Sequence, residues 1–169
     1  MFTKRMSRSL ALAAALTGLG LASQQALATS QTGHANAVIL QAITVTENTQ
    51  LNYADISAPA GGGTVTVTAA ATPSETGTGF TFLGTPAAGQ FTATGSASQT
   101  AVITFSTGDT LSDGAGHTMN LGNYTTDAGS SPAFNSSGNL VFHVGADLTV
   151  GANQVAGTYT GTYTVTVNY

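Results

Sequence analysis

The sequence predicts an all-β protein, an antiparallel β-sandwich. Apolar and polar residues alternate over many short stretches, which is the two-residue period of a strand with one buried face. Glycine- and proline-containing turns separate these stretches at intervals of about 8 to 12 residues, a spacing typical of sandwiches. No stretch after residue 28 keeps the 3.6-residue period and the caps of an amphipathic helix. About eight or nine short strands are therefore expected.

Residues 1–28 have the features of a secretory signal. Lys and Arg occur only within the first eight positions, an apolar run too short to span a bilayer follows, and Ala-Leu-Ala ends the segment. An uncleaved anchor helix is the alternative interpretation. We expect the mature chain to start near Thr29 with a flexible polar stretch over residues 29–37, followed by one domain over residues 38–169.

Composition restricts the partners. Removal of the signal removes all three basic residues and leaves all seven acidic ones, so nucleic acid and anionic lipid are poor partners. No transmembrane span is expected after cleavage. The chain has no cysteine, although an exported protein meets an oxidising compartment. Stability must therefore come from the apolar core and from backbone pairing rather than from disulfides.

The first strand is expected over residues 38–46, where Val38, Ile39 and Leu40 are followed by an alternation of apolar residues and threonine. Polar and glycine-rich residues at 108–116 predict a hairpin loop, and 127–138 predict a second loop. Further extended segments are expected at residues 51–56, 64–69, 80–82, 91–95, 101–106, 119–121, 140–150, with a bulge at Gly145-Ala146, and 157–169.

The last of these strands has the clearest pattern. Its threonines and Asn168 fall on one face, and its opposite face is predicted to join the core. That opposite face is formed by Tyr159, Gly161, Tyr163, Val165, Val167 and Tyr169.

The ending G-T-Y-T-G-T-Y-T-V-T-V-N-Y resembles that of a bacterial secreted family of unknown function, whose members close on G-T-Y-x-G-x-[FY]-x-V-x-V-x-Y. Residues 43–45, 91–95, 111–119 and 142–148 agree with the same family. The ending is also similar to that of spore coat protein U and the archaic chaperone-usher pilins. Two features depart from these patterns: L-N-Y-A replaces the usual L-x-F-G at residues 51–54, and the cysteines common in the pilins are missing.

The resemblance implies an immunoglobulin-like sandwich that one chain leaves incomplete and that strand exchange completes. Because the mature chain has no Lys to protect sheet edges, its edges look suited to pairing. An ordinary first strand packed in its own sandwich is the alternative. The proposed donor residues are Ile39, Ile43 and Val45, and the proposed receiving core contains Tyr159, Tyr163, Val165, Val167 and Tyr169.

Catalytic chemistry is not expected. There is no cysteine and no G-x-S-x-G elbow, and no Lys or Arg remains to hold an oxyanion. His34 lies in the flexible start, His117 lies in or beside a loop, and His143 is expected to face solvent. Asp109 and Asp113 are weak calcium candidates, since Asp-Gly pairs more often form turns. No cofactor is predicted.

These expectations describe a secreted, cell-surface structural subunit of a pilus-like or fibrous assembly, exported through the periplasm. Its partners would be like subunits or other surface proteins joined by β-strand addition, with a periplasmic chaperone as a candidate escort. The alternative is a monomeric extracellular binding module for polysaccharide or adhesion, for which exposed Tyr53 and Tyr124 would be the contact residues.

Overall fold

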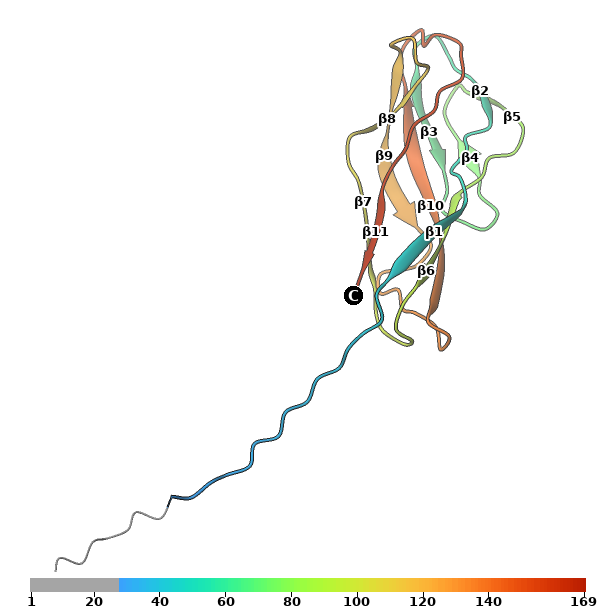
Figure 1. Cartoon of the computed structure of the whole chain (residues 1–169). Coiled ribbons are helices and arrows are strands. Elements are labelled where there is room, and N and C mark those ends of the chain that lie inside the picture. Colours follow the sequence, from blue (N-terminus) through green and yellow to red (C-terminus); the bar gives the residue numbers. More distant parts are fainter. Residues whose placement is uncertain (1–27) are drawn as a thin grey trace, which may run out of the picture. The chain divides into compact units, whose positions relative to one another are not determined.

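The computed structural model describes residues 28–169, of which Val38–Tyr169 form one compact unit. The signal sequence predicted for residues 1–28 lies outside the described residues apart from its last position. Every regular element from residue 28 onward is a strand and every pairing is antiparallel, which confirms the predicted all-β class (Figure 1). A search of these residues finds no helix with the length and apolar character needed to cross a membrane.

The strands form one large sheet and two small ones. The large sheet runs in the order β1 (Thr44–Thr49), β6 (Gly89–Thr94), β10 (Asn139–Val150), β3 (Gly63–Val67) and β4 (Glu75–Thr76), while β9 (Thr118–Thr126) pairs with β10 and β8 (Asp109–Ser112) with β9. The small sheets are β11 (Val165–Asn168) with β7 (Val102–Phe105), and β2 (Asp55–Ser57) with β5 (Thr81–Leu83).

The long strand β10 organises the large sheet. Its first half pairs with β6, its second half pairs with β3, and β9 pairs with the segment from Val144 to Thr149. The register against β9 shifts between Gly145 and Asp147, at the position where the sequence predicts a bulge. Gly145 permits close packing there, because a Cβ would collide with the Val67 carbonyl oxygen.

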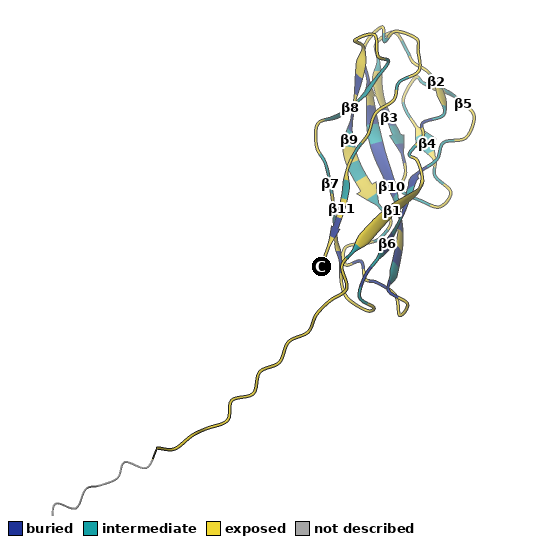
Figure 2. Ribbon diagram, in the orientation of Figure 1, coloured by how far each residue is buried: buried dark blue, intermediate teal, exposed yellow. Residues whose placement is uncertain are grey.

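Two apolar clusters fill the space between the sheets. The β6–β11 cluster joins the large sheet to β7 and β11; its buried members are Phe91, Ala93, Ala101, Phe134, Leu140, Phe142, Val144 and Val167. The β3–β9 cluster joins the other end of the large sheet to β2, β5 and the terminal segment; its buried members are Tyr53, Val65, Val67, Met119, Leu121, Ala146, Leu148 and Val150. Figure 2 shows the buried residues concentrated along the large sheet.

Several element boundaries differ from the sequence prediction. The first strand starts at Thr44 rather than at Val38, and the loop predicted at residues 108–116 is wrong in part, because β8 occupies its first half. The Asp-Gly signal marks only the turn between β8 and β9. Strand β9 also extends to Thr126, well past the short strand expected around Met119.

The terminal segment alternates as predicted but is a regular strand only at Val165–Asn168. Thr160 forms an isolated bridge with Ser112, and Val165 pairs with Phe105. More residues separate Phe105 from Ser112 than separate Thr160 from Val165, so the connection between β7 and β8 loops out at Gly108, whose φ is 76°. This mismatch in length interrupts the ladder.

Candidate functional site: an open groove beside the terminal segment

A cleft of about 1200 Å³ separates residues 47–58 from residues 154–163. It opens onto the β3–β9 cluster, so part of the apolar core forms its floor. The apolar residues that line it include Leu51, Tyr53, Ile56, Leu111, Met119, Leu148, Val150, Tyr159 and Tyr163.

The terminal segment forms one wall of the groove, and its backbone is paired only on the outer side. Thr160 exchanges both of its backbone hydrogen bonds with Ser112, at 2.9 and 2.8 Å. In an extended chain the neighbouring odd-numbered residues direct their N–H and C=O groups to the opposite edge. Within residues 28–169, the backbone groups of Tyr159, Gly161 and Tyr163 have no hydrogen-bond partner.

The opposite wall, residues 49–58, has the same character. Asn52 exchanges two backbone bonds with Ala87, and β2 pairs outward with β5. Leu51 has no backbone partner among the described residues. Ala54 adopts a left-handed conformation, with φ of 51°, and its N–H is held by the Asn52 Oδ1 atom at 2.8 Å. The groove therefore lies between two extended segments whose inner edges are open.

Strand β1 continues this wall and is held mainly by backbone pairing. All six of its residues are exposed, although they pair in register with β6 (Figure 2). Val45 lies opposite Ala93, and Glu47 lies opposite Phe91, and both partners face the core. Directly opposed residues share a face. Val45 and Glu47 therefore point to the inner side of the sandwich, yet both remain exposed, Val45 at 37%.

The groove lining also contains charged and polar groups. Glu47 and Asp55 are its charged lining residues, and both are acidic. The Tyr163 hydroxyl is shielded from solvent yet has no hydrogen-bond partner within residues 28–169. Burial raises the pKa of this phenol, and the negative charge of Glu47 raises it further. The hydroxyl is thus a neutral donor without an acceptor.

A second shielded polar group lies behind the groove floor. Glu75 on β4 is directly opposite Val67, whose side chain faces the core, so its carboxylate lies on the inner face as well. Both carboxylate oxygens are shielded and have no partner among the described residues, and this burial raises the pKa of Glu75 to about 7. Tyr53 donates to the Ala146 carbonyl at 2.8 Å, and burial above all raises its pKa.

The proposed donor residues lie in different environments. Ile39 is 95% exposed, and the neighbouring Val38 is 79% exposed. Ile43 is half-buried against the β6–β11 cluster, and Val45 belongs to β1. Only Ile39 is free of its own domain, whereas donation of Ile43 or Val45 would require β1 to leave β6.

The proposed receiving residues all place their side chains on the inner face or at its end. Tyr159 and Tyr163 line the groove, while Val165 and Val167 pack in the β6–β11 cluster. Tyr169 contacts two other segments through its hydroxyl, which donates to the Gln41 carbonyl and accepts from the Ser96 N–H, each at 2.6 Å. The Tyr169 ring packs on Phe134 at 5.7 Å between centroids.

The calcium candidates are engaged with protein donors. Asp109 accepts from Ser106 and Tyr124, each at 2.7 Å. Asp113 accepts from the Ala115 and His117 N–H groups and contacts the His117 ring at 2.5 Å, and the hydrogen bond with His117 lowers the pKa of this carboxyl. Within residues 28–169, no three His or carboxylate side chains form a metal-binding group.

His143 lies on the outer face, as expected, but it is half-buried. Its ring Nδ1 lies 2.6 Å from Asp127, which also accepts the His143 backbone N–H at 2.6 Å. The other ring nitrogen lies 3.1 Å from the Gln90 amide. Asp127 lies in the loop predicted at residues 127–138. No sequence signal indicated that this loop residue would contact His143 on β10.

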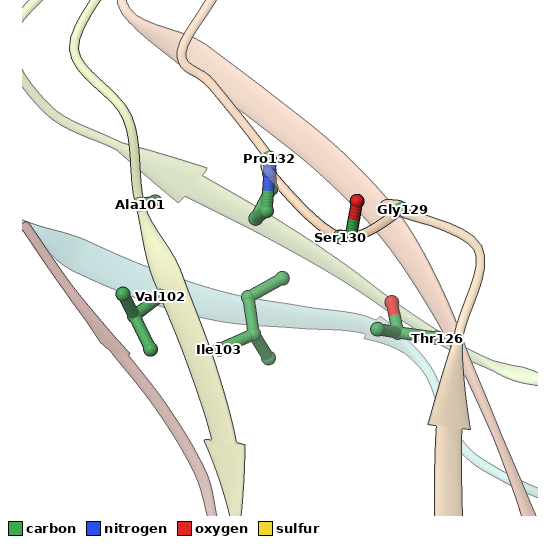
Figure 3. Close-up of a pocket in the computed structure, with 7 residues that line it drawn as sticks. All are labelled: Ala101, Val102, Ile103, Thr126, Gly129, Ser130 and Pro132. Carbon is green, nitrogen blue, oxygen red and sulfur yellow. The ribbon is translucent and has the colours of Figure 1, made fainter.

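A second, smaller pocket of about 130 Å³ lies between β7 and the loop after β9. Figure 3 shows Ile103 between Val102 and Thr126, with Ser130 and Pro132 on the neighbouring loop. Its lining has hydroxyl groups but no ionisable side chain. This lining offers little chemistry, so the large groove is the stronger candidate site.

Sequence reasoning anticipated the wall formed by the terminal segment and missed the other wall. The short alternation at residues 51–56 was visible, but its open inner edge depends on which strands pair with it. Glu47 and the unpartnered Tyr163 hydroxyl were also missed. An acidic residue within an apolar-threonine alternation, on the side of Ile43 and Val45, was the available signal for Glu47.

Comparison with known proteins agrees with the boundaries of the fold. A comparison with curated proteins gave no match. The family model described as "Domain of unknown function (DUF4402)" matches residues 43–169, a range that begins just before β1, ends with the chain and includes both walls of the groove. The chain therefore belongs to this family of domains of unknown function.

Proposed function

We propose that this protein is a secreted structural subunit of a fibre or pilus-like assembly, in which the groove receives an extended segment from a second copy. The observation that carries the proposal is the groove itself, which combines an apolar floor with two open strand edges. Such a site suits an added β-strand, because the backbone of the strand supplies the missing hydrogen bonds and alternate side chains fill the floor.

The proposed occupant is the segment that contains Val38, Ile39 and Leu40. These three residues precede β1 and are exposed, at 79%, 95% and 38%. Exposed neighbouring apolar side chains are costly in water and favour burial in a partner. Residues 28–43 also contain no Lys, Arg, Asp or Glu, so an acidic groove would not repel them. The segment lies outside the family match, as expected for an extension that serves another subunit.

This proposal includes the finer expectations from the sequence: an immunoglobulin-like arrangement, similarity to pilins, export through the periplasm, and no enzymatic activity. A groove exposed during export would favour aggregation, so a periplasmic chaperone that covers it is a candidate partner. The features that support a chaperone are the same open strand edges that would receive the segment of the second copy.

Size-exclusion chromatography and unboiled gel electrophoresis of the full chain, after secretion, test the proposal. We expect ladders of wild-type protein and a loss of ladders in Val38→Asp, because Val38 is 79% exposed in the free subunit. Val141→Asp is the matched control, because Val141 is an exposed β-branched residue on the outer face of β10, at 55% exposure. Ile43→Asp is less informative, since Ile43 also packs in its own domain.

Unchanged ladders in Val38→Asp would contradict the proposed donor segment. Equal losses in Val38→Asp and Val141→Asp would show that any new carboxylate disrupts the protein. A single monomeric peak for the wild-type chain would instead favour the self-contained extracellular binding module.

A further inference from the structure

We infer that the strand entering the groove presents a side-chain amide to the Tyr163 hydroxyl and the Glu47 carboxylate, and that Asn36 of the second copy supplies this amide. The inference rests on the proposed function and adds a polar determinant of register to it. Apolar side chains alone allow a strand to slip along a floor, whereas a buried hydrogen bond fixes one position.

The Tyr163 hydroxyl is shielded and has no hydrogen-bond partner within residues 28–169. Tyr163 is held in place by its ring, which packs at 5.1 Å from Tyr124 and at 6.1 Å from Phe91. Its hydroxyl lies against Gly89, where a Cβ would collide with it. A shielded donor without an acceptor is unfavourable in the free subunit, and an acceptor from the incoming strand would remove that cost.

Glu47 lies directly opposite Phe91, on which the Tyr163 ring packs at 6.1 Å. Its side chain points to the inner face of β1 and is exposed. A carboxylate is an acceptor only, and a phenol at neutral pH is available as a donor. A carboxamide matches both, because its oxygen accepts from Tyr163 while its NH₂ donates to Glu47.

The wall beside Tyr163 can yield to such a side chain. Backbone pairing holds Thr49 to Gln90 and Asn52 to Ala87. Between these pairs, Gln50 and Leu51 have no backbone hydrogen bond within residues 28–169. The Leu51 Cβ and the Tyr163 hydroxyl both border Gly89, so the incoming amide is expected to reach the hydroxyl by displacing this short stretch, with both pairings kept.

Asn36 is selected by the alternation of the donor segment. Asn36, Val38 and Leu40 share one face of an extended strand. The other nearby amide residue, Gln41, is attached to its own domain through its N–H to Ser96 Oγ at 2.7 Å and its carbonyl to Tyr169. Asn36 is therefore the amide that can enter a neighbouring groove together with Val38 and Leu40.

The test uses the full chain carrying Val38→Ser and Ile39→Ser, so that its own segment does not compete, and a synthetic peptide of residues 30–42. Adding Tyr163→Phe to this acceptor should weaken peptide binding about 3- to 10-fold, the range expected for one hydrogen bond. The same change should not lower the melting temperature, because the free subunit loses only an unsatisfied hydroxyl.

The peptide carrying Asn36→Leu should bind the unaltered acceptor more weakly by a similar factor and should lose nothing further on the Tyr163→Phe acceptor. The Gln41→Leu peptide is the matched control and should bind as the wild-type peptide does. Equal or tighter binding to the Tyr163→Phe acceptor, or fully additive losses, would overturn the inference while leaving strand addition intact. No binding of the wild-type peptide would overturn the proposed function, and this inference with it.

Discussion

The two apolar clusters differ in how completely they are covered. The β6–β11 cluster is sealed by β7 and β11, with Phe142 and Val144 fully buried. The β3–β9 cluster is equally well packed on its sheet side, but the groove opens over it between two extended segments. The same long strand, β10, contributes to both clusters. A residue such as Leu148 can therefore be buried and still line an open groove.

The largest expected effect comes from a matched pair on β10, Leu140→Ala in the covered cluster and Leu148→Ala on the groove floor. Leu140 is 8% exposed and Leu148 is 2% exposed, so burial alone predicts a larger loss at Leu148. We expect the reverse, about 4 kcal/mol at Leu140 and about 2 kcal/mol at Leu148, because walls bordering an open groove can relax into a new cavity. Urea unfolding of the two variants measures both losses, and a larger loss at Leu148 would show that the groove walls are rigid.

A smaller, pH-dependent effect is expected for Glu75→Gln. Because the pKa of Glu75 rises from 4.5 in the unfolded chain to about 7 in the folded one, its favourable contribution is present below pH 4.5 and lost as the pH rises through 7. The variant should therefore match wild type near pH 4 and be more stable by about 1 kcal/mol at pH 8, a modest value because solvent screens a side chain that is only partly buried. Thermal melting at both pH values measures this difference. A gain that is the same at pH 4 and pH 8 would contradict the assignment.

The smallest effect is expected at the closed end of the molecule, in Tyr169→Phe. The hydroxyl joins Gln41 and Ser96, but Tyr169 is 41% exposed, so water can replace part of what is lost. We expect a loss of about 0.5–1 kcal/mol. Hydrogen exchange at the Ser96 amide should rise more than exchange in β10, and a uniform rise over both would show that the contact supports the whole domain.

The sequence predicted which face of a strand each side chain occupies better than it predicted which strands pair. The terminal segment shows the difference clearly. Its alternation correctly placed Tyr163 and Val167 on the inner side, but only four residues of this segment, Val165–Asn168, pair as a regular strand. The face that a side chain occupies follows from the two-residue period of the local chain, whereas pairing depends on the loop between β7 and β8, which interrupts the ladder.

The N-terminal region also shows that local apolar character does not determine strand pairing. Val38–Leu40 are three consecutive large apolar residues and were expected to begin a strand, yet they lie outside β1. Strand β1 instead contains Thr44–Thr49, with a single apolar residue, because the open edge of β6 lies opposite these residues. Local apolar character predicts which residues favour burial. It does not identify the surface against which those residues will pack.

The sequence by itself determined the all-β class, the bulge in β10 and the inward face of the terminal segment, because each depends on the residue period and on glycine geometry within a short stretch. Only the tertiary structure decided that residues 47–58 and 154–163 line one groove, and that Glu47 and Tyr163 both belong to its lining. These are relations between segments about a hundred residues apart, set by long-range strand pairing that no local pattern encodes.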